Sequence, residues 1–289
     1  MNSFKKKAAS AVAIGLLTGL ACTSAFAADA PAAEAEAPEV SPITANVTVV
    51  NDYRYRGISQ SNFKPAIQGG FDYAHESGLY IGNWNSSISW ISDSFPSTGG
   101  GKVTAPIEMD FYGGIKKELI GEGFASDLGV LQYYYPTSGI NVSGTTANPN
   151  TTEIYAAQNF TFGPVTGFVK FSYSVSPIFG FANSSGSYYP DLTMNYDTGI
   201  WGLALNAHIG YQYVAGNVQG STPNTTNSSL YSYTDYKLGV TKDFGGGLSL
   251  AAAYITTNAG KTGSTYNYPS PTNKNLGGST GIVSLTKTF

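Results

Sequence analysis

Cysteine, histidine and charge are scarce in this chain of 289 residues, which has one cysteine, two histidines and 11% charged side chains. The cysteine, Cys22, falls inside a predicted export signal, so disulfide and thiolate chemistry is excluded from the exported chain. No glycine-rich phosphate loop, Gly-x-Ser-x-Gly or His/Cys metal spacing occurs, and we expect no cofactor and no metal. The net charge is −3 without a basic face, which argues against a nucleic-acid partner.

Long hydrophobic runs are also missing. Beyond the export signal, no apolar stretch approaches the roughly 20 residues of a membrane helix. Aromatic residues nevertheless make up 13% of the chain, and glycine occupies 35 positions. A low content of charged residues combined with the lack of a long apolar run is typical of a transmembrane β-barrel, because each strand meets lipid on one face and water on the other.

The first 27 residues have the pattern of a signal peptide. Lys5, Lys6 and Lys7 precede an apolar segment from Ala8 to Leu20, and Ala25-Phe26-Ala27 places small residues at a cleavage site. The Ala/Pro/Glu-rich stretch 28–42 follows and is predicted to be a flexible periplasmic leader. The barrel is then expected over residues 43–289.

The connections after residue 57 alternate between tight and long. The tight turns are predicted at His75–Gly78, Leu119–Gly123, Phe162–Pro164, Asp197–Gly199 and Asp243–Gly247. The other connections are longer, polar and rich in Gly, Ser, Thr, Asn and Pro. Bacterial outer-membrane barrels sort their loops in this way, with short periplasmic turns and long outer loops.

Twelve strands are predicted, most of them long enough to cross a bilayer at a tilt. Their ranges are 43–56, 65–75, 79–91, 107–118, 124–136, 152–162, 165–177, 188–197, 201–214, 230–243, 248–258 and 280–289. The fold class is therefore an all-β, antiparallel, up-and-down transmembrane β-barrel. An even strand number puts both termini at the short-turn rim, which predicts periplasmic termini in the outer membrane of a Gram-negative bacterium.

Several strands alternate apolar and polar residues, which identifies a lumenal face. In the strand 165–177, for example, Val169 and Phe171 oppose Lys170 and Ser172. The strands 79–91, 124–136 and 152–162 alternate poorly, so their facing stays open. Charged and polar residues on the predicted inner faces are the candidate pore-lining residues: Asp52, Arg54, Arg56, Asp72, Glu108, Asp110, Lys116, Lys170, Asp191, Asn206, His208, Gln212, Asp235 and Lys237.

Aromatic residues gather near the predicted strand ends, where two interfacial belts are expected. The long-loop belt would contain Tyr53, Tyr55, Trp90, Tyr133–Tyr135, Tyr188, Tyr189, Tyr211, Tyr213, Tyr231 and Tyr233. The short-turn belt would contain Tyr73, Tyr80, Phe160, Phe162, Tyr196, Trp201, Phe244 and Phe289. These belts predict outer-membrane lipid as a partner.

The segment Asn51-Asp52-Tyr53-Arg54-Tyr55-Arg56-Gly57-Ile58-Ser59-Gln60-Ser61 is the most distinctive in the chain. Together with Pro65–Tyr73 and Gly78–Trp84, it resembles the start of the TorF-type outer-membrane porins of proteobacteria. The last strand ends in Phe289 and resembles the C-terminal signal read by the outer-membrane barrel assembly machinery, although Lys287 departs from its pattern. The resemblance implies a channel and supplies no catalytic residues.

Two interpretations of this motif are open. On a strand, Asp52, Arg54 and Arg56 would share one face, opposite Tyr53 and Tyr55. They could form a charged patch at the pore mouth that steers anionic solutes. Alternatively, they could form an interior Asp–Arg network that braces adjacent strands, which we favour.

The predicted function is a porin-like channel for passive diffusion of small hydrophilic solutes, not an enzyme. One alternative is an outer-membrane hydrolase of the lipase type, for which His208 is the histidine available within a strand. Another is a closed structural or adhesion barrel that acts through its outer loops, in particular 259–278. A lumenal hydrogen-bonding role for His208 is favoured over catalysis.

Overall fold

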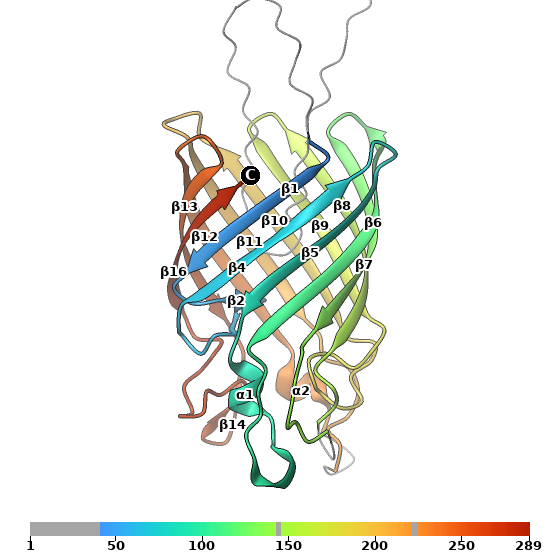
Figure 1. Ribbon diagram of the computed structural model, residues 1–289, viewed down its shortest axis with the longest axis vertical. Helices are drawn as coiled ribbons and strands as arrows, with labels where there is room; N and C mark the ends of the chain where they lie inside the picture. Colours follow the sequence, from blue (N-terminus) through green and yellow to red (C-terminus); the bar gives the residue numbers. More distant parts are fainter. Residues whose placement is uncertain (1–40, 143–145, 221–224) are drawn as a thin grey trace, which may run out of the picture.

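The computed structural model describes residues 41–142, 146–220 and 225–289, and over these residues the chain forms a closed antiparallel β-barrel. Around the barrel the strands follow the order β1-β16-β13-β12-β11-β10-β9-β8-β7-β6-β5-β4, so each strand pairs with its neighbours along the chain and β1 closes on β16 (Figure 1). The predicted signal peptide and nearly all of the predicted leader lie outside the described residues.

Twelve strands form the wall in the described part of the chain, as the sequence predicts. They are β1 (Ile43–Val50), β4 (Ala66–Ala74), β5 (Leu79–Ser87), β6 (Ile107–Gly121), β7 (Phe124–Tyr134), β8 (Thr151–Phe162), β9 (Val165–Ser174), β10 (Tyr188–Asp197), β11 (Leu203–Gln212), β12 (Tyr233–Asp243), β13 (Leu248–Thr257) and β16 (Thr280–Thr288). The predicted fold class is confirmed.

The two faces of the wall differ as the alternation predicts. In β9, Val169 and Phe171 are exposed on the outside, whereas Ser172 and Ser174 are buried inside. The outer surface is covered by exposed aliphatic and aromatic side chains contributed by every wall strand. Such a surface is unstable in water and stable in hydrocarbon, so the outside of the barrel is a lipid-facing surface.

The two ends of the barrel carry different connections (Figure 1). At one end, where β1 begins and β16 ends, the strands are joined by short turns. The other end, here called the mouth, carries α1 (Trp90–Ser94), η1 (Thr98–Gly100), α2 (Asn227–Tyr231) and the hairpin of β14 (Lys261–Thr262) and β15 (Thr265–Tyr266). Among the described residues, no helix has the length and apolar character needed to cross a membrane.

The first wall strand is shorter than predicted. β1 ends at Val50, and the chain then forms a separate hairpin of β2 (Arg54–Tyr55) and β3 (Ile58–Ser59) that pairs with itself. The prediction that Asp52, Arg54 and Arg56 share a strand face opposite Tyr53 and Tyr55 is therefore wrong. The alternating pattern continues past Val50, but hydrogen bonds accepted by Asp52 and a reversal at Arg56-Gly57 turn the backbone inward.

The aromatic belt predicted at the mouth is only partly present. The short-turn end carries exposed rings, among them Phe162, Trp201 and Phe289. At the mouth, in contrast, five of the predicted belt tyrosines are buried inside the barrel: Tyr53, Tyr133, Tyr135, Tyr189 and Tyr233. The hydroxyl groups of all but Tyr233 donate to carboxylates in the lumen, which outweighs the preference of an isolated tyrosine for the headgroup level.

Candidate functional site

The segment 52–61, here called the mouth hairpin, folds into the barrel and is held there by Asp52. The Asp52 carboxylate accepts hydrogen bonds from Ser59 Oγ at 2.5 Å, Ser61 Oγ at 3.2 Å and Arg54 Nε at 2.7 Å. Arg54 also donates to the backbone carbonyls of Leu276 and Gly278 in the last long loop. Asp52 is thus the internal brace of the hairpin, and Arg54 ties the hairpin to the opposite end of the chain.

Arg56 and Gly57 form the turn of the mouth hairpin. Both have positive φ, 45° and 76°, between the register pair Tyr55 and Ile58, as in the tight turns that match the twist of a β-hairpin. A Cβ on Gly57 would overlap the side chains of Asp235 and Thr257 on the wall. Glycine therefore allows both the turn and its close approach to β12 and β13.

Arg56 extends from this turn to the far side of the barrel. Its Nη2 lies 2.8 Å from Glu153 Oε2 on β8, and its Nη1 donates to Gln212 Oε1 on β11 at 2.7 Å. Its guanidinium lies 4.2 Å from the ring centroid of Tyr189 on β10. The hairpin leaves the wall between β1 and β4, so these contacts connect opposite walls across the lumen.

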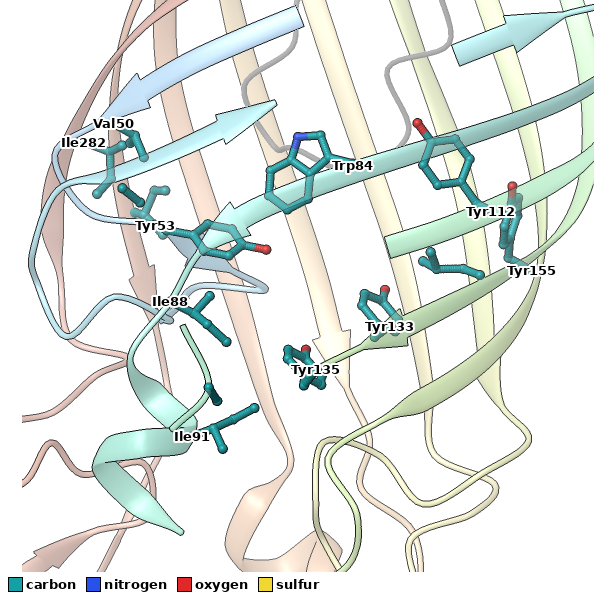
Figure 2. Close-up of a cluster of buried hydrophobic side chains, with 14 of the residues drawn as sticks. Val50, Tyr53, Trp84, Ile88, Ile91, Tyr112, Tyr133, Tyr135, Tyr155 and Ile282 are labelled. Carbon is teal, nitrogen blue, oxygen red and sulfur yellow. The ribbon is translucent and has the colours of Figure 1, made fainter. Parts of the chain in front are cut away.

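Tyrosine hydroxyls fix the rest of the hairpin. Tyr53 donates to Glu108 Oε1 at 2.6 Å, and Tyr135 donates to the other oxygen of Glu108 at 2.9 Å. Tyr55 shares a hydrogen bond with Tyr133, which lies on β7. Figure 2 shows Tyr53 reaching from the mouth hairpin into the interior, where Tyr133 and Tyr135 also lie. The hairpin therefore narrows the lumen at the mouth with both charge and aromatic bulk.

A second cluster surrounds His208 on β11. Its Nδ1 lies 2.9 Å from Asp191 Oδ1, and its Nε2 lies 2.8 Å from Asp235 Oδ2. Tyr189 donates to the second oxygen of Asp235 at 2.8 Å. Both ring nitrogens face carboxylates, so the imidazole has no free nitrogen with which to take a proton from a nucleophile.

Polar pairs continue toward the short-turn end. Tyr112 donates to Asp72 at 2.5 Å, and Tyr80 donates to Asp127 at 2.6 Å. The Lys170 ammonium lies 4.3 Å from the ring centroid of Tyr155. Lys116 on β6 is in register with Asp127 on β7. Both signs of charge therefore line this part of the lumen.

The structure brings all fourteen candidate residues to the inside of the barrel, in three groups. The mouth hairpin contains Asp52, Arg54 and Arg56, and Gln212 receives Arg56. The His208 group contains Asp191 and Asp235, with Lys237 in register opposite His208 and Asn206 bonded to Asn195 and Thr241. The remaining candidates, Asp72, Glu108, Asp110, Lys116 and Lys170, lie on β4, β6 and β9. Whether they line a conducting path stays a prediction.

Two interior acids, Asp127 and Glu153, are not among the residues predicted from the sequence to line the lumen. Both lie on strands whose alternation is poor, β7 and β8, because glycine and alanine occupy several of their positions. Each is buried and hydrogen-bonded to a tyrosine hydroxyl or to Arg56. Each is the one acidic residue of its strand. A charge is costly on the lipid face, so this acid could have identified which face of the strand points into the lumen.

A cavity of about 510 Å³ lies between the mouth hairpin and the long loops. Arg56 and Gln212 line it on the hairpin side. The rest of its lining mixes polar, aliphatic and aromatic side chains, and the aromatic ones include Trp90, Phe179, Tyr233 and Tyr268. Its size falls in the range of small-molecule sites in proteins.

A closed antiparallel barrel with an apolar outside and a charged, hydroxyl-rich inside defines this protein as a twelve-stranded transmembrane β-barrel. Residues 32–289 match the family described as "Bacterial protein of unknown function (Gcw_chp)", and the chain belongs to this family. Among curated proteins, no match is found.

Solved porin and channel structures are similar to this chain at low sequence identity. The NanC porin in its rhombohedral crystal form is 9% identical, with a TM-score of 0.50, over 85% of this chain and 98% of that one. The KdgM porin is 5% identical, with a TM-score of 0.48, over 86% and 98%. The outer membrane channel DcaP of Acinetobacter baumannii is 12% identical, with a TM-score of 0.41, over 82% and 65%.

Proposed function

We propose that this protein is a non-enzymatic, porin-like channel for small hydrophilic solutes in the outer membrane of a Gram-negative bacterium. The observation that carries the proposal is the lumen itself, which is lined by charged and hydroxyl side chains of both signs inside an apolar outer surface. A polar interior of this kind is what a solute path through a membrane barrel requires. The similarity to solved porins and the TorF-type resemblance support the same function.

In this proposal the mouth hairpin is the constriction of the channel. It crosses the lumen and is tied to β6, β8 and β11 through Glu108, Glu153 and Gln212. Solutes that enter between the long loops would meet the cavity first and the Arg56 turn next. Conductance through the intact barrel is therefore expected to be small.

The orientation follows from the same proposal. The short turns, the start of β1 and the end of β16 would face the periplasm, and the long loops would face the outside. The final strand, ending at Phe289, would be the segment that the barrel assembly machinery reads. Surface proteolysis of intact cells should then cut the long loops and spare the short turns.

Planar-bilayer recordings test the channel. Purified wild-type protein should give small, discrete conductance steps. Replacing Arg54–Ser59 with a short glycine linker should give larger steps, because the constriction is removed. A matched control shortens the exposed tip Thr98–Gly101 and should leave the steps unchanged. Folded protein that conducts in neither the wild-type nor the hairpin variant would contradict a channel and favour a closed barrel that acts through its outer loops.

The hydrolase alternative receives no support from the surroundings of His208. A lipase-type mechanism needs a histidine nitrogen free to accept the proton of a nucleophile. Asp191 and Asp235 occupy both nitrogens of this ring. We therefore assign His208 a role in bracing β10, β11 and β12.

A further inference from the structure

We propose that the lumen beneath the mouth hairpin holds a monovalent cation at Asp110, with Glu153 as the second acid of the site. Asp110 lies on the inner face of β6 and is 0% exposed, and Glu153 on β8 is 1% exposed. The cation is either an alkali ion or the ammonium group of a solute, since each of these carries one positive charge in a small volume. The inference concerns binding and does not depend on whether solutes pass through the barrel.

Asp110 is an uncompensated carboxylate in the lumen. Neither oxygen of Asp110 has a hydrogen-bond partner, and Glu153 Oε1 also lacks one. Glu108, the third acid nearby, differs because Tyr53 and Tyr135 bond its two oxygens. A buried carboxylate without partners is strongly destabilising unless it is neutralised, so Asp110 needs a proton or a cation.

Both lumenal arginines and Lys170 are engaged away from Asp110. Arg56 forms its ion pair with the other oxygen of Glu153, and Arg54 forms its ion pair with Asp52. The Lys170 ammonium lies over the ring of Tyr155. Among the described residues, no ion pair reaches Asp110. Because the described residues supply no cation to Asp110, we infer that the compensating charge comes from solution.

Two aromatic residues flank Asp110 in the sheet. Across the sheet, Asp110 is in register with Trp84 on β5 and with Tyr133 on β7, and both side chains are buried inside the barrel (Figure 2). A carboxylate flanked by aromatic rings attracts cations through charge and through the ring quadrupole. Anions are disfavoured here because the charges of Glu108 and Glu153 also act on this position.

The set of donors also limits the kind of cation. Within the described part of the chain, no group of three His, Cys, Asp or Glu side chains is close enough to hold a metal ion together. A divalent ion such as Ca²⁺, which takes six to eight oxygen ligands, therefore lacks its shell. A monovalent cation needs less compensating charge and fewer protein ligands. The unpaired carboxylate of Asp110 and the Glu153 carboxylate, which also pairs with Arg56, match this requirement.

Thermal unfolding of the full chain in detergent tests the site. The wild-type protein is compared in potassium chloride, methylammonium chloride and tetraethylammonium chloride at one ionic strength, which keeps general screening equal. We expect a higher Tm with potassium or methylammonium than with the bulky ion, because ligands that bind only the folded state stabilise it. The relative effects of the first two distinguish an alkali site from an ammonium site.

Asp110→Asn should abolish this cation dependence and raise the Tm measured in tetraethylammonium, because the amide keeps the shape and removes the unpaired charge. The matched control is Asp127→Asn, another buried lumenal acid whose Oδ1 accepts from Tyr80, and it should keep the dependence. Equal Tm values in all three salts, or an unchanged dependence in Asp110→Asn, would overturn the proposal. A protein that does not conduct but keeps the cation dependence would reject the channel alone.

Discussion

Arg56 and Glu153 join opposite walls of the barrel, with 2.8 Å between Nη2 and Oε2 and almost no solvent access to either side chain. The arginine comes from a two-residue turn that leaves the wall beside β1, and the glutamate stands on β8. This ion pair therefore helps to hold the mouth hairpin across the lumen. It also joins parts of the chain that are 97 residues apart.

Arg56→Gln should destabilise the folded barrel and enlarge its conductance. Removing one partner of a buried ion pair costs about 3–5 kcal/mol, because the remaining charge loses its compensation. Urea unfolding in lipid vesicles measures the cost. The double variant Arg56→Gln/Glu153→Gln should recover part of it, and strictly additive losses would contradict a direct coupling between the two residues.

His208→Ala should destabilise the barrel without affecting any lipid hydrolysis. The substitution leaves Asp191 and Asp235 without their shared partner, and we expect a loss of about 3 kcal/mol in the free energy of unfolding. His75→Ala is the matched control, because His75 lies in an exposed turn and its imidazole has hydrogen bonds to Ser77 within the same turn. A loss of hydrolytic activity specific to His208→Ala would support the hydrolase instead.

Val169→Arg should be costly because Val169 stands at the middle of β9 on the lipid-facing surface. An arginine at the bilayer midplane costs about 2–4 kcal/mol, whereas near the interface the cost falls to about 0–1 kcal/mol. Leu119→Arg, at the exposed short-turn end of β6, provides the interfacial comparison. Refolding equilibria in vesicles measure both, and equal costs would contradict the assigned membrane position.

Gly129→Ala should weaken the lumen packing. Inside the barrel, Gly129 lies directly under the ring of Tyr155, and an added Cβ would overlap the phenol. We expect a loss of about 1–3 kcal/mol, as for an overpacked core. Gly281→Ala is the matched control, since nothing lies within 4 Å of a Cβ at this position. A neutral Gly129→Ala would show that Tyr155 can move without cost.

Strand count, antiparallel order and the separation of short from long connections could all be predicted from the sequence. Each is a local property: alternation identifies a face, and Gly/Pro/Asn clusters identify where a strand ends. The inner positions of β9 and β11, such as Lys170 and His208, follow from the same period of two. The inner positions of β7 and β8 could not be predicted in this way, because their glycines and alanines fit either face.

The sequence by itself determined the wall: twelve strands, an apolar outside, and polar residues turned inward, because a strand crossing lipid must alternate to keep its charges out of hydrocarbon. The tertiary structure alone decided that residues 52–61 leave the wall and cross the lumen. No local pattern distinguishes a strand that continues from one that turns inward. The inward turn depends on hydrogen-bond partners that lie on distant strands, namely Glu108, Glu153 and Gln212. Only the closed barrel brings these partners within reach of Tyr53 and Arg56.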